Sequence, residues 1–353
     1  NWAAIDQTFE HLHQVEVPAE WADFAPIPEA VSEDRPDFVR NIVDPIARQE
    51  GDDLSVGDLI DNGMLGGRMP LGTAAYEKRG IALQVPEWLP EACTMCNECS
   101  FVCPHAAIRP FLADEAEMEQ APEGFIVRDF KGKDGLKYRI QVSLEDCTGC
   151  GLCVEACPAS ALVMKDYETQ QAEAVDWAFA MTLRQKENPM KKTSVRGSQF
   201  EKPLLEFSGA CAGCGETPYI KLLTQLYGDR MMIANTTGCS SIWGASAPIS
   251  PYTTNELGQG PAWSNSLFED NAEYGFGMYM ANTVRRQRVA NRVEAALASA
   301  NPIDSDIRSL LEDWLLHFAE GEGTQQRAAK LTAALSKETD PELLAILADR
   351  DLF

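Results

Sequence analysis

Two cysteine runs with the same spacing constrain the fold of this chain more than any other feature of its sequence. Each run reads C-x2-C-x2-C-x3-C-P, and each cysteine of the second run follows its counterpart in the first by 54 positions. The first run comprises Cys93, Cys96, Cys99 and Cys103, and the second comprises Cys147, Cys150, Cys153 and Cys157. A repeat of this kind indicates an internal duplication of one metal-binding unit.

The spacing predicts two 4Fe-4S clusters. Three thiolates two residues apart can surround one face of a cluster, and the fourth cysteine of such a run ligates the other cluster. We therefore expect one cluster on Cys93, Cys96, Cys99 and Cys157, and a second on Cys147, Cys150, Cys153 and Cys103. Gly149 and Gly151 should let the second loop approach its cluster closely, because they lack a Cβ.

Zinc sites and disulfides are the alternative readings of these cysteines. Zinc sites typically use paired C-x2-C or Cys/His sets rather than four-cysteine runs. Disulfides are rare in chains without a secretion signal, and residues 1–6 do not resemble one. His105 is expected to pack beside a cluster rather than to ligate it, since each cluster already has four thiolates. His11, His13 and His317 have no ligand spacing and are expected on solvated surfaces.

Composition and charge narrow the function classes. The chain has 353 residues, 45% of them hydrophobic, which is enough for two or three globular cores. Its formal charge of −24 repels nucleic acid and favours partners with a basic face. No run of about 18 apolar residues is present to span a bilayer. We expect a cytoplasmic protein that binds neither nucleic acid nor membranes, and the absence of Met at position 1 suggests a piece of a longer polypeptide.

Three further cysteines lie outside the two runs. Cys211 and Cys214 stand in the segment SGACAGCGE (208–216), and Cys239 stands in NTTGCSS (235–241). Taken alone, cysteines of this kind could be buried core thiols. A site of the α/β cofactor-binding type is the alternative, because the residues between them predict a helix, a strand and a loop.

The predicted helix follows Cys214 directly. Thr217 can cap it with Pro218 at its first position, and Gly228 can end it. Its expected buried stripe consists of Ile220, Leu222, Leu223 and Leu226. Residues 231–234 then predict a short buried strand that leads into the loop with Cys239. This layout could bring all three thiolates to the edge of a sheet.

Several segments together resemble the pyruvate:ferredoxin oxidoreductase family, whose members are thiamine-diphosphate-dependent enzymes acting on 2-oxoacids. The segments are GTAAYEKRGIA (72–82), CSFVCPHAAIRP (99–110), CAGCGET (211–217), TGCSSIWG (237–244) and GPAWSNSLFEDNAEYG (260–275). The resemblance runs from about residue 35 to about residue 290. It is specific, because unrelated ferredoxins would share only the two cysteine runs.

The resemblance implies a third 4Fe-4S cluster held by Cys211, Cys214 and Cys239 beside thiamine diphosphate and Mg2+, with Glu216 and Cys239 also touching the thiamine cofactor. It implies oxidative decarboxylation of a 2-oxoacid, with pyruvate as the expected substrate and coenzyme A as the acyl acceptor. Electrons would leave one at a time through the clusters to ferredoxin or flavodoxin. The protein's part would be to bind, align and tune these cofactors, and no catalytic residue is assigned in this chain.

The sequence also departs from the family pattern. Family polypeptides are several times longer, and their parts for the aminopyrimidine ring, the substrate carboxylate and coenzyme A have no counterpart here. The Gly-Asp-Gly segment and the fourth ligand to the third cluster are not found either. No cysteine follows Cys239, so this chain offers three of the four thiolates. We therefore expect a middle piece of a larger enzyme, completed by other polypeptide in a dimer or larger assembly.

The expected fold class is mixed α+β and α/β. A two-cluster ferredoxin-like domain (86–165) is expected between a linker and packing region (1–85) and, after a linker (166–202), an incomplete α/β thiamine-diphosphate-binding domain with a helical extension (203–353). Within the ferredoxin-like domain, residues 125–127 and 138–142 predict a hairpin. The basic stretch from Arg184 to Lys202 is expected to be a solvated linker rather than a dock for an acidic partner.

Two late helices complete the prediction. Asp304 should cap one of them, and Pro341 should begin the other. Their apolar stripes are Ile307, Leu310, Leu311, Trp314 and Phe318 in the first, and Leu343, Leu344 and Leu347 in the second. These stripes predict a core or an interface rather than a cofactor site.

Two functions remain open from the sequence. The first is the electron-relay segment of a thiamine-dependent 2-oxoacid oxidoreductase, and the second is a stand-alone ferredoxin-like carrier without catalysis. Cys211, Cys214, Cys239 and Glu216 separate them, since a simple carrier needs none of these residues.

Overall fold

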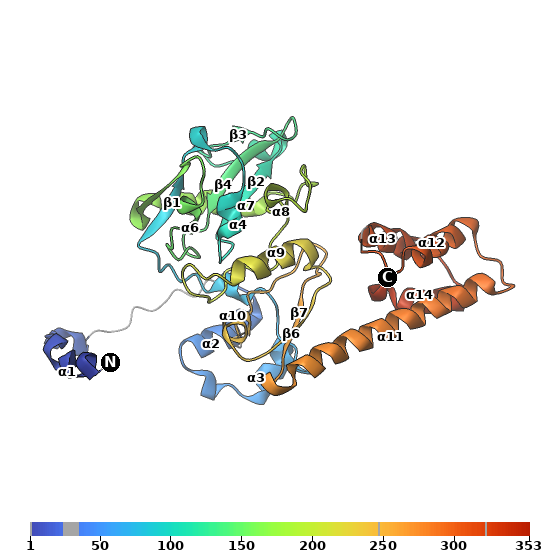
Figure 1. Cartoon of the computed structure of the whole chain (residues 1–353), viewed down its shortest axis with the longest axis horizontal. Helices are drawn as coiled ribbons and strands as arrows, with labels where there is room; N and C mark the ends of the chain where they lie inside the picture. Colours follow the sequence, from blue (N-terminus) through green and yellow to red (C-terminus); the bar gives the residue numbers. More distant parts are fainter. Residues whose placement is uncertain (1, 24–34, 246–247, 322) are drawn as a thin grey trace. The chain divides into compact units, whose positions relative to one another are not determined.

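The structure is a computed structural model of the chain, and it describes residues 2–23, 35–245, 248–321 and 323–353. It divides into two compact units, Asn1–Leu65 and Gly66–Phe353. The first unit consists of short helices and turns (Figure 1), and the second contains every cysteine of the chain. The two units are described separately below.

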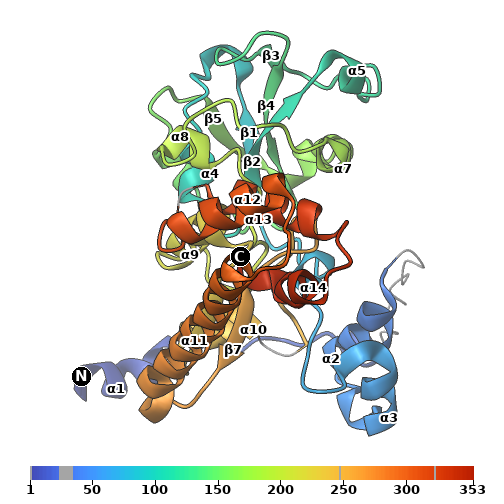
Figure 2. The ribbon, with the colours of Figure 1, turned by 90° about the vertical axis from the view of Figure 1, so that its right-hand side faces the viewer.

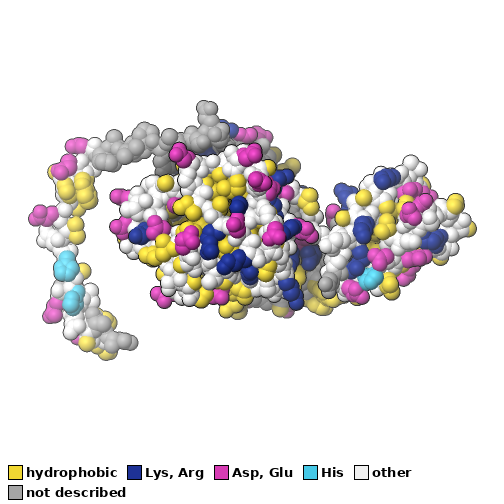
Figure 3. All heavy atoms as spheres, turned by 90° about the horizontal axis from the view of Figure 1, so that it is seen from above, with side chains coloured by type: hydrophobic (Ala, Val, Ile, Leu, Met, Phe, Trp, Pro, Cys, Tyr) yellow, Lys and Arg dark blue, Asp and Glu magenta, His cyan; other side chains and the backbone are white. Residues whose placement is uncertain are grey.

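The first unit contains α1 (Trp2–Gln7), α2 (Asp44–Ala47) and α3 (Val56–Leu59), with helical turns at Thr8–His11, Ala19–Asp23, Val39–Val43, Gly51–Asp53 and Ile60–Met64. Its small core is formed by Phe38, Val39, Ile42 and Val43. His11 and His13 are exposed, as predicted. Residues 2–23 carry acidic side chains and no Lys or Arg, whereas side chains of both signs lie on the larger body drawn in Figure 3.

The second unit begins with a duplicated module, residues 84–166. One half runs through β1 (Gln84–Trp88), α4 (Glu98–Val102) and β2 (Ile108–Ala113), and the other through β4 (Lys137–Val142), α6 (Leu152–Glu155) and β5 (Leu162–Asp166). The halves exchange strands, because β1 pairs antiparallel with β5 and β2 pairs antiparallel with β4 (Figure 2). Each sheet therefore takes one strand from each copy, and neither half can complete its sheet alone.

The duplication extends to the backbone conformation. The residues with positive φ in the first copy have counterparts 54 positions later in the second. The pairs are Met95 (62°) with Gly149 (67°), Asn97 (64°) with Gly151 (76°), and Ala106 (53°) with Ser160 (49°). Both loops therefore adopt the left-handed conformation at the same positions. Glycine, which adopts it without strain, occupies two of these positions in the second copy and none in the first. Gly149 has a second reason, since a Cβ there would lie 2.8 Å from the Gln84 carbonyl oxygen.

The predicted hairpin between the two runs is present with a shifted first strand. β3 (Arg128–Asp129) pairs antiparallel with β4 and gives the strand order β2-β4-β3. Residues 125–127, predicted as the first strand, instead lead into β3, and the Phe125 ring packs on the ring of Phe179 at 4.9 Å. That aromatic contact favours burial of Phe125 under α7 (Glu173–Thr182) over strand pairing.

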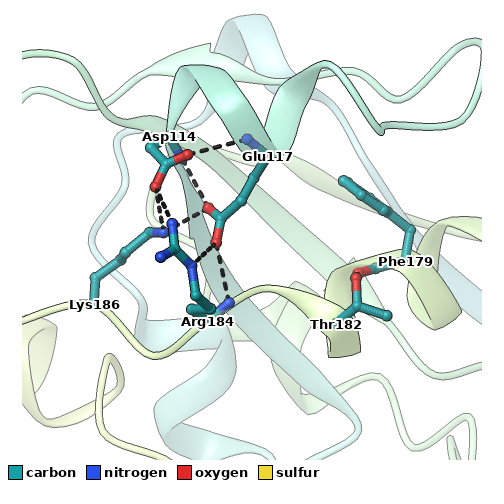
Figure 4. A network of polar contacts seen from close by, with 6 residues as sticks. All are labelled: Asp114, Glu117, Phe179, Thr182, Arg184 and Lys186. Carbon is teal, nitrogen blue, oxygen red and sulfur yellow. Dashed lines mark hydrogen bonds and ion pairs between the residues drawn. The ribbon is translucent and has the colours of Figure 1, made fainter.

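The stretch predicted as a solvated linker is tied down by its basic residues. Arg184 and Lys186 both form ion pairs with Asp114 and Glu117, the N-cap and third residue of α5 (Glu115–Met118) (Figure 4). The Arg196 guanidinium, at the start of α8 (Val195–Ser198), lies over the Phe130 ring. These positive charges are engaged within the chain, which leaves little of the stretch to attract an acidic partner.

The segment after this stretch contains α9 (Thr217–Tyr227), β6 (Met232–Asn235), α10 (Cys239–Ala245) and β7 (Ala262–Asn265). The helix ends before Gly228, as predicted, but its N-cap is Glu216 and not Thr217, whose side chain is fully buried. Strands β6 and β7 form a parallel pair. β6 was predicted to be buried, yet Met232 is 53% exposed.

The predicted apolar stripe of α9 is wrong at Leu223, and its other members, Ile220, Leu222 and Leu226, are only half-buried. Leu223 is exposed, and the buried positions of the helix are Thr217, Lys221, Thr224 and Gln225. Of these, Lys221 donates to carbonyls at the end of α4, and Gln225 accepts a hydrogen bond from Gln199, which follows α8. Partner chemistry, rather than hydrophobicity, therefore decides which face of α9 is buried.

The chain ends in a helical core. It comprises α11 (Asn271–Ala298), α12 (Ser305–Leu316), α13 (Thr324–Leu335) and α14 (Pro341–Ala348). Asp304 caps α12 through hydrogen bonds from the amides of Asp306 and Ile307, which confirms the predicted start. Ile307, Leu311 and Trp314 are buried in this core, as predicted. His317 is half-buried and bonds the Asp313 carbonyl through Nδ1.

Candidate functional site

The first run of cysteines lines a pocket together with a cysteine of the second run. Cys93, Cys96 and Cys99 share this pocket with Cys157. Apolar and aromatic side chains, including Trp88, Tyr138 and Leu162, complete its wall. The four sulfur-bearing residues that spacing assigned to one cluster therefore surround one space.

A second pocket repeats the arrangement with the roles exchanged. Cys147, Cys150 and Cys153 line it together with Cys103. His105 also lines this pocket, and its ring is 3% exposed. Packing of α4 against α6 explains the exchange, because these helices carry Cys99 and Cys153 and end just before Cys103 and Cys157.

Backbone amides point at the sulfur atoms in both pockets. The amide of Met95 donates to Cys93 Sγ at 3.4 Å, and the equivalent amide of Gly149 donates to Cys147 Sγ at 3.4 Å. The Ala161 amide donates to Cys157 Sγ at 3.2 Å. Hydrogen bonds to the charged form of a thiol favour that form, so both loops are arranged to stabilise thiolate sulfur.

Burial acts in the opposite direction on several of these thiols. It raises the pKa of Cys147 to about 12, and neighbouring Cys103 and Cys150 add to the effect. Burial likewise raises the pKa values of Cys99 and Cys153. Neutral thiols are therefore preferred while nothing is bound, and a metal must displace protons to be ligated. The positive charge of iron is the compensation that such a site requires.

The residues present fit an iron–sulfur cluster in each pocket. Each pocket offers four cysteine sulfurs and one buried donor that lacks a hydrogen-bond partner among the described residues, Trp88 Nε1 in the first and Thr148 Oγ1 in the second. None of the His, Cys, Asp and Glu side chains in the described ranges gather closely enough to hold a single ion. A four-iron cluster is held by four cysteine thiolates, so four cysteines around one pocket suit it.

The three remaining cysteines lie in a less enclosed place. Cys211 and Cys239 are exposed, and Cys214 is half-buried. The Glu216 amide donates to Cys214 Sγ at 3.4 Å, which repeats the contact seen at Cys93 and Cys147. The sequence predicts Cys239 in a loop, but the structure places it as the first residue of α10. Buried core thiols are thus excluded as an interpretation for Cys211 and Cys239.

A tryptophan connects the two parts of this three-cysteine segment (residues 208–245). Trp243 Nε1 donates to Glu216 Oε2 at 3.3 Å. Since Trp243 stands one helical turn after Cys239 in α10, this bond holds the helix of Cys239 near the loop of Cys214. The sequence pattern did not single out Trp243 for this role.

The second pocket adjoins the three-cysteine segment directly. A Cβ placed on Gly213 would lie 3.9 Å from Cys150 Cβ. His105 Nε2 bonds the Ala210 carbonyl at 2.9 Å, and the Phe207 amide donates to the His105 carbonyl at 2.9 Å. Burial lowers the pKa of His105 and so favours the neutral ring, which can donate from Nε2. His105 is therefore a packing residue that links two sites, as the sequence suggested.

Lys221 is a buried residue beside the first cysteine run that the sequence analysis missed. It is 1% exposed, and its ammonium donates to the carbonyls of Cys103 (3.0 Å), Phe101 (3.2 Å) and Ser100. These carbonyls belong to the C-terminal end of α4, where helix carbonyls lack internal partners and favour a cation. A single lysine within an amphipathic pattern gives no signal of this role, because solvent exposure is the usual state of lysine.

Comparisons with known proteins agree with this geometry. A model for the 4Fe-4S dicluster domain matches residues 92–161, and a model named EKR, described as a domain of unknown function, matches residues 25–82. None of the helices described for this chain combines the length and apolar character needed to cross a bilayer.

Curated relatives align along the whole chain. The chain is 51% identical to a pyruvate-flavodoxin oxidoreductase of Klebsiella pneumoniae, with 100% of this chain and 30% of that protein aligned. It is 48% identical to the pyruvate:ferredoxin oxidoreductase of Moorella thermoacetica, over 96% of this chain and 29% of that protein. It is 46% identical to the mitochondrial pyruvate dehydrogenase [NADP(+)] of Euglena gracilis, over 100% of this chain and 20% of that protein. The chain thus spans 30% or less of the length of these three relatives.

Proposed function

The chain belongs, as one segment, to the family of pyruvate:ferredoxin and pyruvate-flavodoxin oxidoreductases, and we propose that it is the electron-relay segment of such an enzyme. In this proposal the segment serves oxidative decarboxylation of a 2-oxoacid, with pyruvate as the substrate and acyl-coenzyme A as the product. Ferredoxin or flavodoxin accepts the electrons. The observation that carries the proposal is the pair of pockets in which each cysteine run is completed by the last cysteine of the other.

We assign one 4Fe-4S cluster to each pocket. Cys93, Cys96, Cys99 and Cys157 would hold the first, and Cys147, Cys150, Cys153 and Cys103 the second. A bound 4Fe-4S cluster supplies one-electron transfer at a potential set by its surroundings. The amides of Met95 and Gly149 support the ligating sulfurs, and the aromatic walls keep water away from the first pocket.

The three-cysteine segment would contribute to a third cluster and to the thiamine diphosphate site. Cys211, Cys214 and Cys239 are the proposed thiolate donors, and Glu216 and Cys239 the proposed contacts to the thiamine cofactor. Their exposure leaves room for a ligand and for a fourth donor from other polypeptide. Glu216 is oriented by Trp243, so its carboxylate is held at a fixed position beside Cys214. Mg2+ and coenzyme A are expected to bind mainly through other parts of the enzyme.

The alternative of a stand-alone ferredoxin-like carrier does not hold. The relationship to the Klebsiella protein covers 100% of this chain and is not confined to the cysteine runs. A carrier would need neither the Cys214–Glu216 contact nor the Trp243 bond that orients Glu216.

Iron analysis tests the proposal. The chain purified without oxygen should be brown and hold about eight irons firmly, four for each pocket. A colourless preparation without iron or labile sulfide would contradict the assignment of both pockets. About twelve firmly held irons per chain would contradict the view that the third site needs a donor from outside these 353 residues.

The role of the third site needs the complete enzyme. Cys214→Ser should leave the signals of the two pockets intact and stop electron delivery from the thiamine intermediate. Turnover equal to that of the wild type would remove the third site from the proposal.

A further inference from the structure

Three consecutive charged residues, Glu77, Lys78 and Arg79, have no part in the function proposed above. They lie near the end of the region matched by the domain of unknown function and within the second compact unit. Lys78 adopts a left-handed backbone conformation, with φ of 44°. A residue with a Cβ rarely adopts this conformation, so surrounding contacts must hold it in place.

Lys78 contacts the loop of the second pocket. Its ammonium lies 2.5 Å from Asp146 Oδ2, and Asp146 immediately precedes Cys147. The Asp146 side chain is only 3% exposed and also accepts a hydrogen bond from Ser143 Oγ at 2.6 Å. Two residues after Lys78, the Gly80 amide donates a hydrogen bond to the Glu145 carbonyl at 2.9 Å. A buried carboxylate of this kind depends on its cation, since an unpaired charge is costly inside a protein.

Arg79 contacts the loop of the three-cysteine segment. Its guanidinium donates to the Ser208 carbonyl at 3.3 Å and pairs with Glu77. A Cβ on Gly209 would lie 3.5 Å from the same guanidinium, so the loop passes close to Arg79. The Lys78 ammonium lies 5.0 Å from the centre of the Phe207 ring, which adds a cation–π contact to the same loop.

We propose that Lys78 and Arg79 form a clamp that fixes the loop of Cys147 and Cys150 against the loop of Cys211 and Cys214. These loops meet where Gly213 approaches Cys150, so the clamp sets the separation of the second pocket from the three-cysteine segment. The rate of electron transfer between two centres falls steeply with distance. The clamp is thus a positioning device, and its link to electron transfer rests on the proposed function.

Hydrogen exchange tests the clamp without reference to electron transfer. In the full chain, Lys78→Met should speed amide exchange about tenfold in peptides over residues 143–150 and 205–214, because each loop loses a fixed contact. Arg79→Gln should speed exchange in 205–214 alone. Lys78→Arg keeps the charge and should restore protection. Lys137→Met is the control, since Lys137 also pairs with an aspartate, but with the exposed Asp129 on the β3–β4 hairpin, away from both loops.

A spectroscopic measurement tests the positioning itself. In the complete reduced enzyme, Lys78→Met should weaken the magnetic coupling between the second and third clusters, whereas Lys78→Arg and Lys137→Met should not change it. Unchanged exchange in both loops for Lys78→Met and Arg79→Gln would overturn the clamp, whatever the clusters do. Unchanged coupling with faster exchange would overturn its positioning role. If Lys78→Met does not fold, Arg79→Gln decides by the same two measurements.

The failure of the proposed function would look different. A wild-type enzyme without a third cluster signal would remove the proposed function of the three-cysteine segment, while the exchange data would still decide whether the clamp exists.

Discussion

The duplicated module and the three-cysteine segment use the same local contact in different surroundings. Each of the three cysteine sets contains one cysteine whose sulfur accepts a hydrogen bond from the backbone amide two residues later. These cysteines are Cys93, Cys147 and Cys214. In the module, however, each set is closed by a fourth cysteine from the other copy. The comparison shows that a local loop can direct a backbone amide at a cysteine sulfur by itself. Whether four cysteines surround one pocket depends on what packs opposite the loop.

Exposure differs in part between the two regions. Cys99 and Cys153 of the module are buried although Cys150 is exposed, whereas Cys211 and Cys239 of the segment are exposed and Cys214 is half-buried. The module closes its sites by strand exchange between its own halves, so the whole enclosure lies within residues 84–166. Strand β6 of the three-cysteine segment forms a parallel pair with β7, which follows the segment, and Met232 on β6 is exposed. Parallel sheets are usually covered on both faces, so this segment is the part that further polypeptide is expected to cover.

Removal of a crossing cysteine should have the largest effect on this comparison. Cys103→Ser should abolish the second cluster, with loss of about four irons, although Cys103 belongs to the first run. The signal of the first pocket should remain. Iron analysis measures the loss of iron, and electron paramagnetic resonance of the reduced chain measures the signal of the first pocket. Cys239→Ser is the control and should spare both pockets, and loss of the first signal in Cys103→Ser would show that the ligands do not cross.

Loss of the buried lysine should have the next largest effect. Lys221→Met leaves three carbonyls at the end of α4 without their donor, which should lower the free energy of unfolding by about 2 kcal/mol. Denaturant unfolding without oxygen measures this. Lys202→Met is the matched control, since that ammonium donates to a single carbonyl, that of Thr254. Equal stability of the two variants would show that Lys221 does not hold α4 to α9.

Thiol reactivity should separate the two regions by a smaller factor. In the metal-free chain, Cys211 and Cys239 should react with iodoacetamide about an order of magnitude faster than Cys99 and Cys153, because alkylation requires an accessible thiolate. Mass spectrometry of partly labelled chains gives the order. Early labelling of Cys99 would show that the module opens without its metal.

Acid should produce the smallest effect, at the ion pairs that join residues 184–186 to α5. The hydrogen bond from Lys186 lowers the pKa of Asp114. Burial acts to raise the pKa of Glu117, but the hydrogen bonds from Lys186 and from the backbone amides of Asp114 and Arg184 together lower it. Depressed carboxyl pKa values stabilise the fold above the unfolded pKa, and this contribution is lost as pH falls through the folded pKa. Protection of the amides in residues 184–190, relative to their intrinsic exchange rate at each pH, should therefore decrease below about pH 4. Lys186→Met should already show this lower protection at neutral pH, and equal protection in the two proteins would contradict the role of these pairs.

Several parts of the prediction depended on short-range signals and were correct for that reason. Asp304 and Gly228 mark helix ends because capping is decided within a few residues. The hairpin strand at 138–142 was found because its alternation is local, whereas the strand before it was shifted by the contact of Phe125 with Phe179. The buried stripe of α9 was assigned to leucines because hydrophobicity alone does not reveal that carbonyls lie opposite.

The sequence by itself determined that two cysteine runs are copies of one unit, since the identical spacing and the offset of 54 positions need no structure to be seen. It also indicated that Gly149 and Gly151 allow a tight loop around the second run, and both have a positive φ. Only the tertiary structure decided that the copies exchange strands, that Lys221 is buried on α4, and that Lys78 and Arg79 join two cysteine loops. The physical reason is that these contacts join distant parts of the chain. Those of Lys78, Arg79 and Lys221 join residues from 68 to 129 positions apart, and such separations leave no periodicity in the sequence.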